Sequence, residues 1–216
     1  MQMAQRELVL DRSQVRLILV GVISGLTSEV EIVRSAVERY RPSAIGLSIT
    51  GEEIEGIRKW NGNENSELPP YSDFDRFYIR EMSRFGEVRL PSPPLAFLIE
   101  FAGKARLPVF PLDMDEEEYS ATYLKYVSPA SLFFSSLFRS RRRRRNLRGT
   151  AEEVACEIDR ISMHPKGVEI VELERDRYIS RKILSLAMEN TPFMAIINYE
   201  RLSRILSFLK ESGEHF

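Results

Sequence analysis

The sequence predicts an α/β fold with a central, mainly parallel sheet and helices on both faces of that sheet. Short apolar runs of strand length alternate with longer stretches of helical periodicity along the chain. Hydrophobic residues make up 43% and charged residues 29% of the sequence, which is typical of a globular protein. A length of 216 residues suits one large domain, so we predict a single domain over residues 1–216.

Four apolar runs are predicted as the strands. Residues 15–22 (VRLILVGV) are almost uninterruptedly apolar, as expected of a strand that is covered on both faces. The other predicted strands are residues 44–49, 109–112 and 193–198. Because helical segments separate them, parallel pairing with crossover helices is the expected connection.

Helix starts are indicated by Ser, Thr or Asp residues that precede a Glu by three positions. This capping-box spacing predicts helix starts at the pairs Ser28 and Glu31, Thr50 and Glu53, and Thr150 and Glu153. The stretch between the second and third predicted strands is long and helical in character. We therefore predict a helical insertion at about residues 61–106 that covers one edge of the sheet or forms a lid.

The supply of metal-binding side chains excludes one class of site. Cys156 is the only cysteine, and His164 and His215 are the only histidines. Neither histidine follows a predicted strand, so a zinc site built from histidine and cysteine is excluded within one chain. We predict no metal and no cofactor.

Several other functional classes lack their sequence signals. The chain has no P-loop, GxGxxG, HExxH, CxxC or GxSxG motif. No apolar run is long enough to span a membrane, and the first residues do not form a signal peptide. We therefore expect a cytoplasmic protein with no membrane association. The formal net charge of −1 gives no general attraction for nucleic acid.

Open α/β sheets bind ligands beyond the carboxyl ends of their strands, so the candidate site lies in the segments that follow the predicted strands. These segments are residues 21–24, 48–53, 113–115 and 198–201.

Several of these segments carry short motifs. The first predicted strand ends in Gly21-Val22-Ile23-Ser24 and is followed by Thr27-Ser28-Glu29-Val30. Asp113-Met114-Asp115 follows the third predicted strand, and Glu174-Arg175-Asp176 lies in a long predicted helix. Over residues 15–206, this order of elements and motifs resembles the TraB/pheromone-shutdown family, which is related to erythromycin-esterase-like and Tiki-type proteins.

Three positions depart from the pattern of that family. Ser24 and Arg201 stand where the family has histidines, and Ser48 stands where it has a glutamate. In active relatives these groups would bind a divalent metal or activate water. A serine hydroxyl is a poor metal ligand, and a guanidinium repels a cation.

The resemblance therefore implies a diverged, non-catalytic TraB-like domain that binds a small anionic ligand or a protein partner. The ligand-binding residues would be Ser24, Ser48, Arg175 and Arg201. Arg201 would either bind an anion or pair internally with Asp113 or Asp115.

A metal-dependent hydrolase or peptidase with a rebuilt site is the first alternative. Its catalytic residues would be Asp113, Asp115, Glu174 and Asp176, whose oxygen ligands suit magnesium, manganese or calcium. Each candidate also has a structural interpretation. Asp115 would cap the following helix, and the residues of the Glu174-Arg175-Asp176 motif would form ion pairs.

The second alternative is binding of nucleic acid or an anionic surface through residues 139–148, which include seven arginines. Arginine forks bind phosphates in two-bond contacts, and the candidates are Arg141, Arg142, Arg143, Arg144 and Arg145. An exposed linker neutralised by neighbouring acidic segments is the favoured interpretation of this tract. The aromatic-rich residues 132–138 predict an interface, and a homodimer is the expected assembly.

Overall fold

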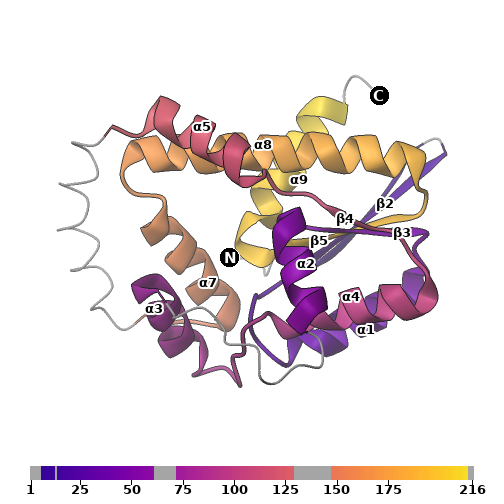
Figure 1. Ribbon diagram of the computed structural model, residues 1–216, viewed down its shortest axis with the longest axis horizontal. Helices are drawn as coiled ribbons and strands as arrows, with labels where there is room; N and C mark the ends of the chain where they lie inside the picture. Colours follow the sequence, from indigo (N-terminus) through magenta and orange to yellow (C-terminus); the bar gives the residue numbers. More distant parts are fainter. Residues whose placement is uncertain (1–5, 13, 61–71, 129–146, 214–216) are drawn as a thin grey trace.

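The computed structural model describes residues 6–12, 14–60, 72–128 and 147–213 (Figure 1). Its centre is a five-stranded sheet with the strand order β1-β2-β5-β3-β4. The strands are β1 (Glu7–Arg12), β2 (Val15–Val22), β3 (Ala44–Leu47), β4 (Val109–Pro111) and β5 (Phe193–Asn198). β1 is antiparallel to β2, and every other neighbouring pair is parallel. The predicted α/β class and mainly parallel sheet are therefore confirmed.

Eight helices surround the sheet within the described part of the chain. They are α1 (Glu29–Tyr40), α2 (Gly51–Trp60), α3 (Asp73–Met82), α4 (Pro93–Ala105), α5 (Glu116–Tyr126), α7 (Ala151–Ser162), α8 (Lys166–Glu189) and α9 (Tyr199–Gly213). No helix among the described residues has the length and apolar character needed to cross a membrane.

Two of the three capping boxes expected from the sequence are formed. At the start of α2, the side chains of Thr50 and Glu53 each accept a bond from the backbone N–H of the other residue. Thr150 and Glu153 form the same pair of bonds at the start of α7. The prediction at Ser28 is wrong. Its backbone is already helical and its side chain makes no capping bond, because a tight turn supplies backbone acceptors for Glu29 and Val30 instead.

The parallel register brings the carboxyl ends of β2, β5 and β3 to one edge of the sheet. Val22 lies opposite Asn198, and Leu47 lies opposite Ile196. The segments that begin at Ser24 and Ser48 therefore leave the sheet next to the start of α9. This edge is where the candidate residues meet.

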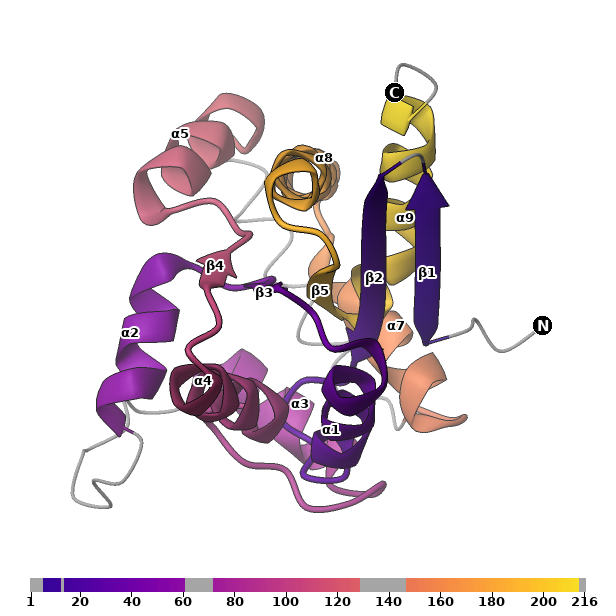
Figure 2. The same ribbon diagram turned by 90° about the vertical axis from the view of Figure 1, so that its right-hand side faces the viewer.

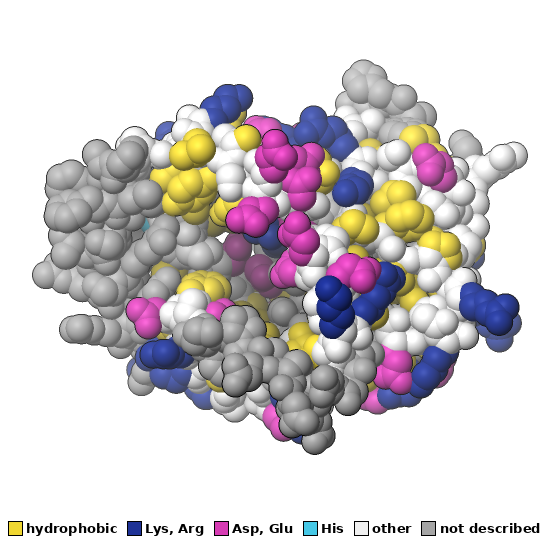
Figure 3. All heavy atoms as spheres, viewed as in Figure 1, with side chains coloured by type: hydrophobic (Ala, Val, Ile, Leu, Met, Phe, Trp, Pro, Cys, Tyr) yellow, Lys and Arg dark blue, Asp and Glu magenta, His cyan; other side chains and the backbone are white. Residues whose placement is uncertain are grey.

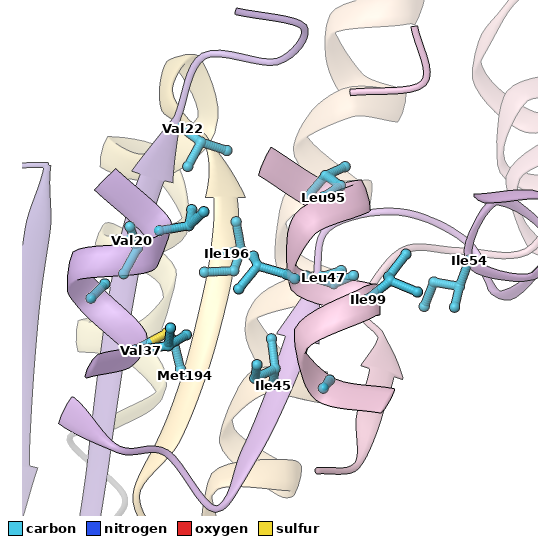
Figure 4. Packing of buried hydrophobic residues seen from close by; sticks show 14 of the residues in the cluster. Val20, Val22, Val37, Ile45, Leu47, Ile54, Leu95, Ile99, Met194 and Ile196 are labelled. Atoms are coloured by element: carbon cyan, nitrogen blue, oxygen red, sulfur yellow. The ribbon is translucent and has the colours of Figure 1, made fainter. Parts of the chain in front are cut away.

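Alternate side chains of the central strands pack into two separate hydrophobic clusters. Val20, Ile45 and Ile196 belong to a cluster completed by α1, α2 and α4 (Figure 4). Leu19 and Ile197, which alternate with those residues, belong to a cluster completed by α8 and α9. Figure 2 shows α1 and α4 below the strands and α8 above them. Burying one such Ile or Leu side chain contributes about 1.5–3 kcal/mol, so this alternation anchors the helices on the sheet.

One element of the sheet was not predicted, and two predictions fall outside the described residues. β1 pairs with β2 as an antiparallel edge strand, whereas no strand was predicted before residue 15. Residues 61–71 and 129–146 lie outside the described residues. The predictions for Arg141–Arg145 and for the aromatic segment 132–138 fall within the second of these ranges. Between β3 and β4 the described chain forms α2, α3 and α4, and its interpretation as an insertion stays a prediction.

Candidate functional site

The face onto which the strands open is hollowed, and acidic side chains gather around the hollow (Figure 3). One open pocket of about 430 Å³ lies between α2 and α5. Its lining residues are Glu52, Asp115, Glu116, Glu117 and Ser120. Four of these five side chains are carboxylates, so the rim of the pocket has a negative potential.

Asp113, two residues before Asp115 of the pocket lining, forms a two-bond ion pair with Arg175. Asp113 follows β4, its side chain is fully buried, and its Oδ1 accepts a bond of 2.7 Å from Nε of Arg175. Oδ2 of Asp113 accepts a second bond from Nη2 of the same guanidinium. Burial alone would lower the pKa of Arg175, but the bonds to Asp113 outweigh burial and raise it. Arg175 is therefore a fixed cation.

Asp176, the next residue of α8, is held by two arginines of α9. Its Oδ1 accepts a bond of 2.6 Å from Nε of Arg201, and its Oδ2 accepts a bond of 2.6 Å from Nε of Arg204. The side chains of Asp176 and Arg201 are 0% and 5% exposed. Two charge-assisted bonds compensate the cost of burying this carboxylate.

Glu172 and Asp159 extend these two pairs into one network. Oε2 of Glu172 lies 3.3 Å from Nη1 of Arg175 and 3.3 Å from Nη2 of Arg201. Nη1 of Arg204 donates a bond of 2.7 Å to Asp159 of α7. The network therefore ties the end of β4 and the helices α7, α8 and α9 together. We call the seven residues Asp113, Asp159, Glu172, Arg175, Asp176, Arg201 and Arg204 the strand-end network.

Glu200 lies beside this network with an unusual carboxyl group. Part of the residue remains exposed, but its Oε2 is buried and has no hydrogen-bond partner within the described structure. Burial raises the pKa of Glu200 to about 7, and the charge of Asp159 adds to this rise while Arg201 and Arg204 oppose it. The pKa of Glu200 is therefore close to neutral pH.

Two nitrogens of the network are also incompletely bonded. Nη2 of Arg201 and Nη2 of Arg204 are buried and make no hydrogen bond within the described structure. The contact of Arg201 with Glu172 is thus an ion pair without hydrogen-bond geometry. Burial also raises the pKa of Asp159, although Arg204 opposes this rise.

The predicted ligand-binding residues have internal partners. Arg175 and Arg201 belong to the strand-end network, but Arg201 pairs with Asp176 and not with Asp113 or Asp115, because α8 packs directly against α9. The hydroxyl of Ser48 accepts a bond of 3.3 Å from the backbone N–H of Asn198, which joins β3 to β5. Ser24 follows β2, and its carbonyl oxygen accepts a bond of 2.7 Å from the hydroxyl of Tyr78.

The four predicted catalytic carboxylates are not gathered in one place. Asp113 and Asp176 belong to the strand-end network, whereas Asp115 forms the capping box of α5 with Glu118. Glu174 pairs with Arg177 at 2.6 Å on the same helix. Within the described residues, no three His, Cys, Asp or Glu side chains are arranged to hold a metal ion.

Four residues of this region were not singled out by the predictions from the sequence. Glu172 and Arg204 lie four and three positions from Asp176 and Arg201 on their helices, so same-face spacing was an available signal. Glu200 lay inside the predicted strand-end segment 198–201 but was not singled out. Asp159 had no sequence signal, because only the packing of α7 on α9 brings it to Arg204.

The fold and the site define an α/β protein with a buried ion-pair network at the carboxyl edge of a mainly parallel sheet. Searches with protein-family models and against curated proteins give no match to this chain.

Proposed function

We propose that the chain is a diverged TraB-like domain that binds a partner molecule and does not catalyse hydrolysis. The observation that best supports this proposal is the state of Asp113 and Asp176. Each of their four carboxylate oxygens accepts a bond from an arginine. Carboxylates in this state are not available to bind a metal or to accept a proton from water.

The TraB-like assignment is supported by the contacts between segments that are distant in the sequence. The motifs 113–115 and 174–176 meet through the pair Asp113–Arg175. The segment that follows β5 joins them through Arg201 and Asp176. In the proposed scaffold, helices cover both faces of the sheet, and α3 and α4 form the described part of the helical insertion.

The hydrolase alternative requires rearrangement of the same residues. Arg175 would have to leave Asp113, and Arg201 and Arg204 would have to leave Asp176, before either carboxylate could bind a cation. Removing one partner from a buried pair costs about 3–5 kcal/mol. Asp115 and Glu174 would also have to leave their cap and their surface ion pair.

The negative charge of the pocket favours a partner with basic groups over a small anion. Nε of Arg201 is occupied by Asp176 and the side chain is only 5% exposed, so this guanidinium offers little accessible surface to an anion. Glu52, Glu116 and Glu117 around the pocket would repel an anion and attract basic groups. A partner with basic side chains is therefore the better supported ligand.

Metal content and hydrolysis test the absence of catalysis. The purified protein should contain no stoichiometric zinc or manganese, and peptide and ester substrates should not turn over after either metal is added. The matched variants are Asp176→Asn and, as the control, Glu169→Gln at an exposed position of the same helix, with folding checked by circular dichroism. Tight stoichiometric metal binding, together with hydrolysis that is lost in Asp176→Asn and retained in Glu169→Gln, would overturn the proposal.

Binding of charged probes tests the ligand class. We expect a lysine-rich peptide to bind at low salt and to bind less tightly when Glu116 and Glu117 are both changed to Gln. Glu31→Gln on α1 is the control, because Glu31 is exposed and does not line the pocket. Phosphate binding that disappears in Arg201→Gln, without binding of the peptide, would favour a small anion instead.

A further inference from the structure

The strand β1 forms an open edge of the sheet. It is the outermost strand beside β2, and within the described residues it pairs on that one side only (Figure 2). All six of its residues keep a regular register with β2, and its sequence, ELVLDR, contains no proline or glycine. Such an edge presents unpaired backbone groups and is a template for another strand.

The hydrogen-bonding phase of the ladder shows which residues face outward. Gly21 N–H donates a bond of 2.7 Å to the carbonyl oxygen of Arg6, so these two residues form a hydrogen-bonded pair. Because such pairs alternate along an antiparallel ladder, Leu8 and Leu10 also bond to β2. The backbone N–H and C=O groups of Glu7, Val9 and Asp11 therefore point away from the sheet.

We propose that two copies of this chain pair through β1, antiparallel and across a twofold axis at Val9, to form one continuous sheet. In this register Val9 lies opposite Val9 of the second copy, and Glu7 lies opposite Asp11 of the second copy. All three outward-facing residues of each strand then form hydrogen-bonded pairs. A closed twofold assembly of this kind leaves no further β1 edge exposed.

Acidic residues lie opposite each other on both sides of Val9 in this register, and each of them has an arginine partner. Glu7 forms an ion pair with Arg39 at 2.8 Å, and Asp11 forms one with Arg16 at 3.5 Å. Two bare carboxylates opposite each other would repel. Each carboxylate here brings its own guanidinium, so the dimer places two ion pairs side by side on each side of the axis.

The apolar side chains also match in this register. Val9 is 37% exposed and is one of three large hydrophobic residues that are exposed in the described structure. On the opposite face of β1, Leu8 and Leu10 are partly buried against the cluster that contains α9. Leu8 of one copy lies opposite Leu10 of the other in the dimer, so this apolar layer continues across the axis, and Val9 contacts Val9 of the second copy on the other face.

The first test measures the oligomeric state of the full chain and two variants by sedimentation velocity at micromolar concentrations. Val9→Pro removes an outward-facing N–H and no hydrogen bond to β2, and proline is tolerated on edge strands. Val9→Thr keeps that N–H and a β-branched side chain, so it is the control. We expect the unmodified chain and Val9→Thr to be dimers, and Val9→Pro to dissociate with a constant at least about tenfold higher. Circular dichroism and thermal melting should show that Val9→Pro remains folded.

The second test fixes the register by cross-linking in a Cys156→Ser background. The Cα atoms of a hydrogen-bonded antiparallel pair are about 5.5 Å apart, which suits a disulfide. Val9→Cys should therefore form a covalent dimer under mild oxidation, whereas Asp11→Cys should not. A monomer at these concentrations overturns the proposal. A dimer that is unaffected by Val9→Pro, or that cross-links equally through position 11, also overturns it.

Discussion

Nε of Arg201 donates a hydrogen bond of 2.6 Å to Oδ1 of Asp176, and both side chains are almost completely buried. This pair connects the first turn of α9 to the middle of α8, and the second oxygen of Asp176 is held by Arg204. A carboxylate between two guanidiniums is a strong structural connection, because each partner compensates the buried charge of the other.

Removing this carboxylate should therefore destabilise the protein strongly. Asp176→Ala leaves Arg201 buried without its main partner, and we expect the free energy of unfolding to fall by about 3–5 kcal/mol. Urea denaturation monitored by circular dichroism measures the effect. Glu174→Ala is the control on the same helix, because its pair with Arg177 is exposed and should contribute at most about 1 kcal/mol. Equal losses for the two variants would show that the buried network is not a major source of stability.

Replacing the Asp113–Arg175 fork by a single contact should have a smaller effect. Arg175→Lys keeps the positive charge but can no longer donate two parallel bonds to the two oxygens of Asp113. We expect a loss of about 1–3 kcal/mol in the free energy of unfolding, measured by the same urea titration. The control is Arg58→Lys on α2, because Arg58 forms an exposed ion pair with Glu55 three residues earlier; it should change stability by less than about 0.5 kcal/mol.

Replacement by alanine should have opposite effects on stability at Gly46 and at Gly56. A Cβ on Gly46 of β3 would lie 2.7 Å from Cζ of Phe193 and 2.8 Å from a methyl group of Leu112. Gly46→Ala should therefore lower the free energy of unfolding by about 1–3 kcal/mol through overpacking. A Cβ on Gly56 of α2 would meet no atom within 4 Å, so Gly56→Ala should raise it by about 0.5–1 kcal/mol. Thermal melting of the two variants checks the signs, and a destabilised Gly56→Ala would contradict the packing of α2.

The parts of the fold that the sequence predicts are those set by local or strongly periodic signals. β2 and β5 are predicted well because strands buried on both faces read as continuous apolar runs. The caps at Thr50 and Thr150 are predicted because capping is a contact between residues three positions apart. β1 escapes prediction because it is short, carries charges at both ends, and is joined to β2 without an Asn-Gly or Asp-Gly turn.

The residues of the candidate site also divide into those that local sequence signals predict and those that depend on helix packing. The rule that ligands and polar groups gather at the carboxyl ends of parallel strands points to Asp113, Ser48 and Arg201. The partner of Arg201 depends on how α8 packs against α9, which no local signal encodes. For that reason its pairing with Asp176 was not predicted. Asp159 of α7 was missed for the same reason.

Glu200 should make the stability of the protein depend on pH near neutrality. Its pKa is raised from an ordinary value of 4.5 to about 7, first because of burial and then because of the charge of Asp159. Between these two values the unfolded chain loses the proton while the folded chain keeps it. The contribution of Glu200 is therefore fully favourable below pH 4.5 and is lost as the pH rises to about 7.

The variant Glu200→Gln isolates this effect, because an amide does not titrate and has nearly the same shape. The free energy of unfolding should be measured by urea denaturation at pH 5, 6, 7 and 8 for both proteins. We expect Glu200→Gln to gain stability relative to the unmodified chain as the pH rises, by a total on the order of 1–3 kcal/mol. Asp159, whose pKa is also raised, remains in both proteins and is coupled to Glu200, so the difference reports the titration of Glu200 together with this coupling. A difference that stays constant from pH 5 to pH 8 would mean that Glu200 is ionised in the folded protein throughout this range, with its buried Oε2 bonded to water or to one of the two incompletely bonded guanidiniums.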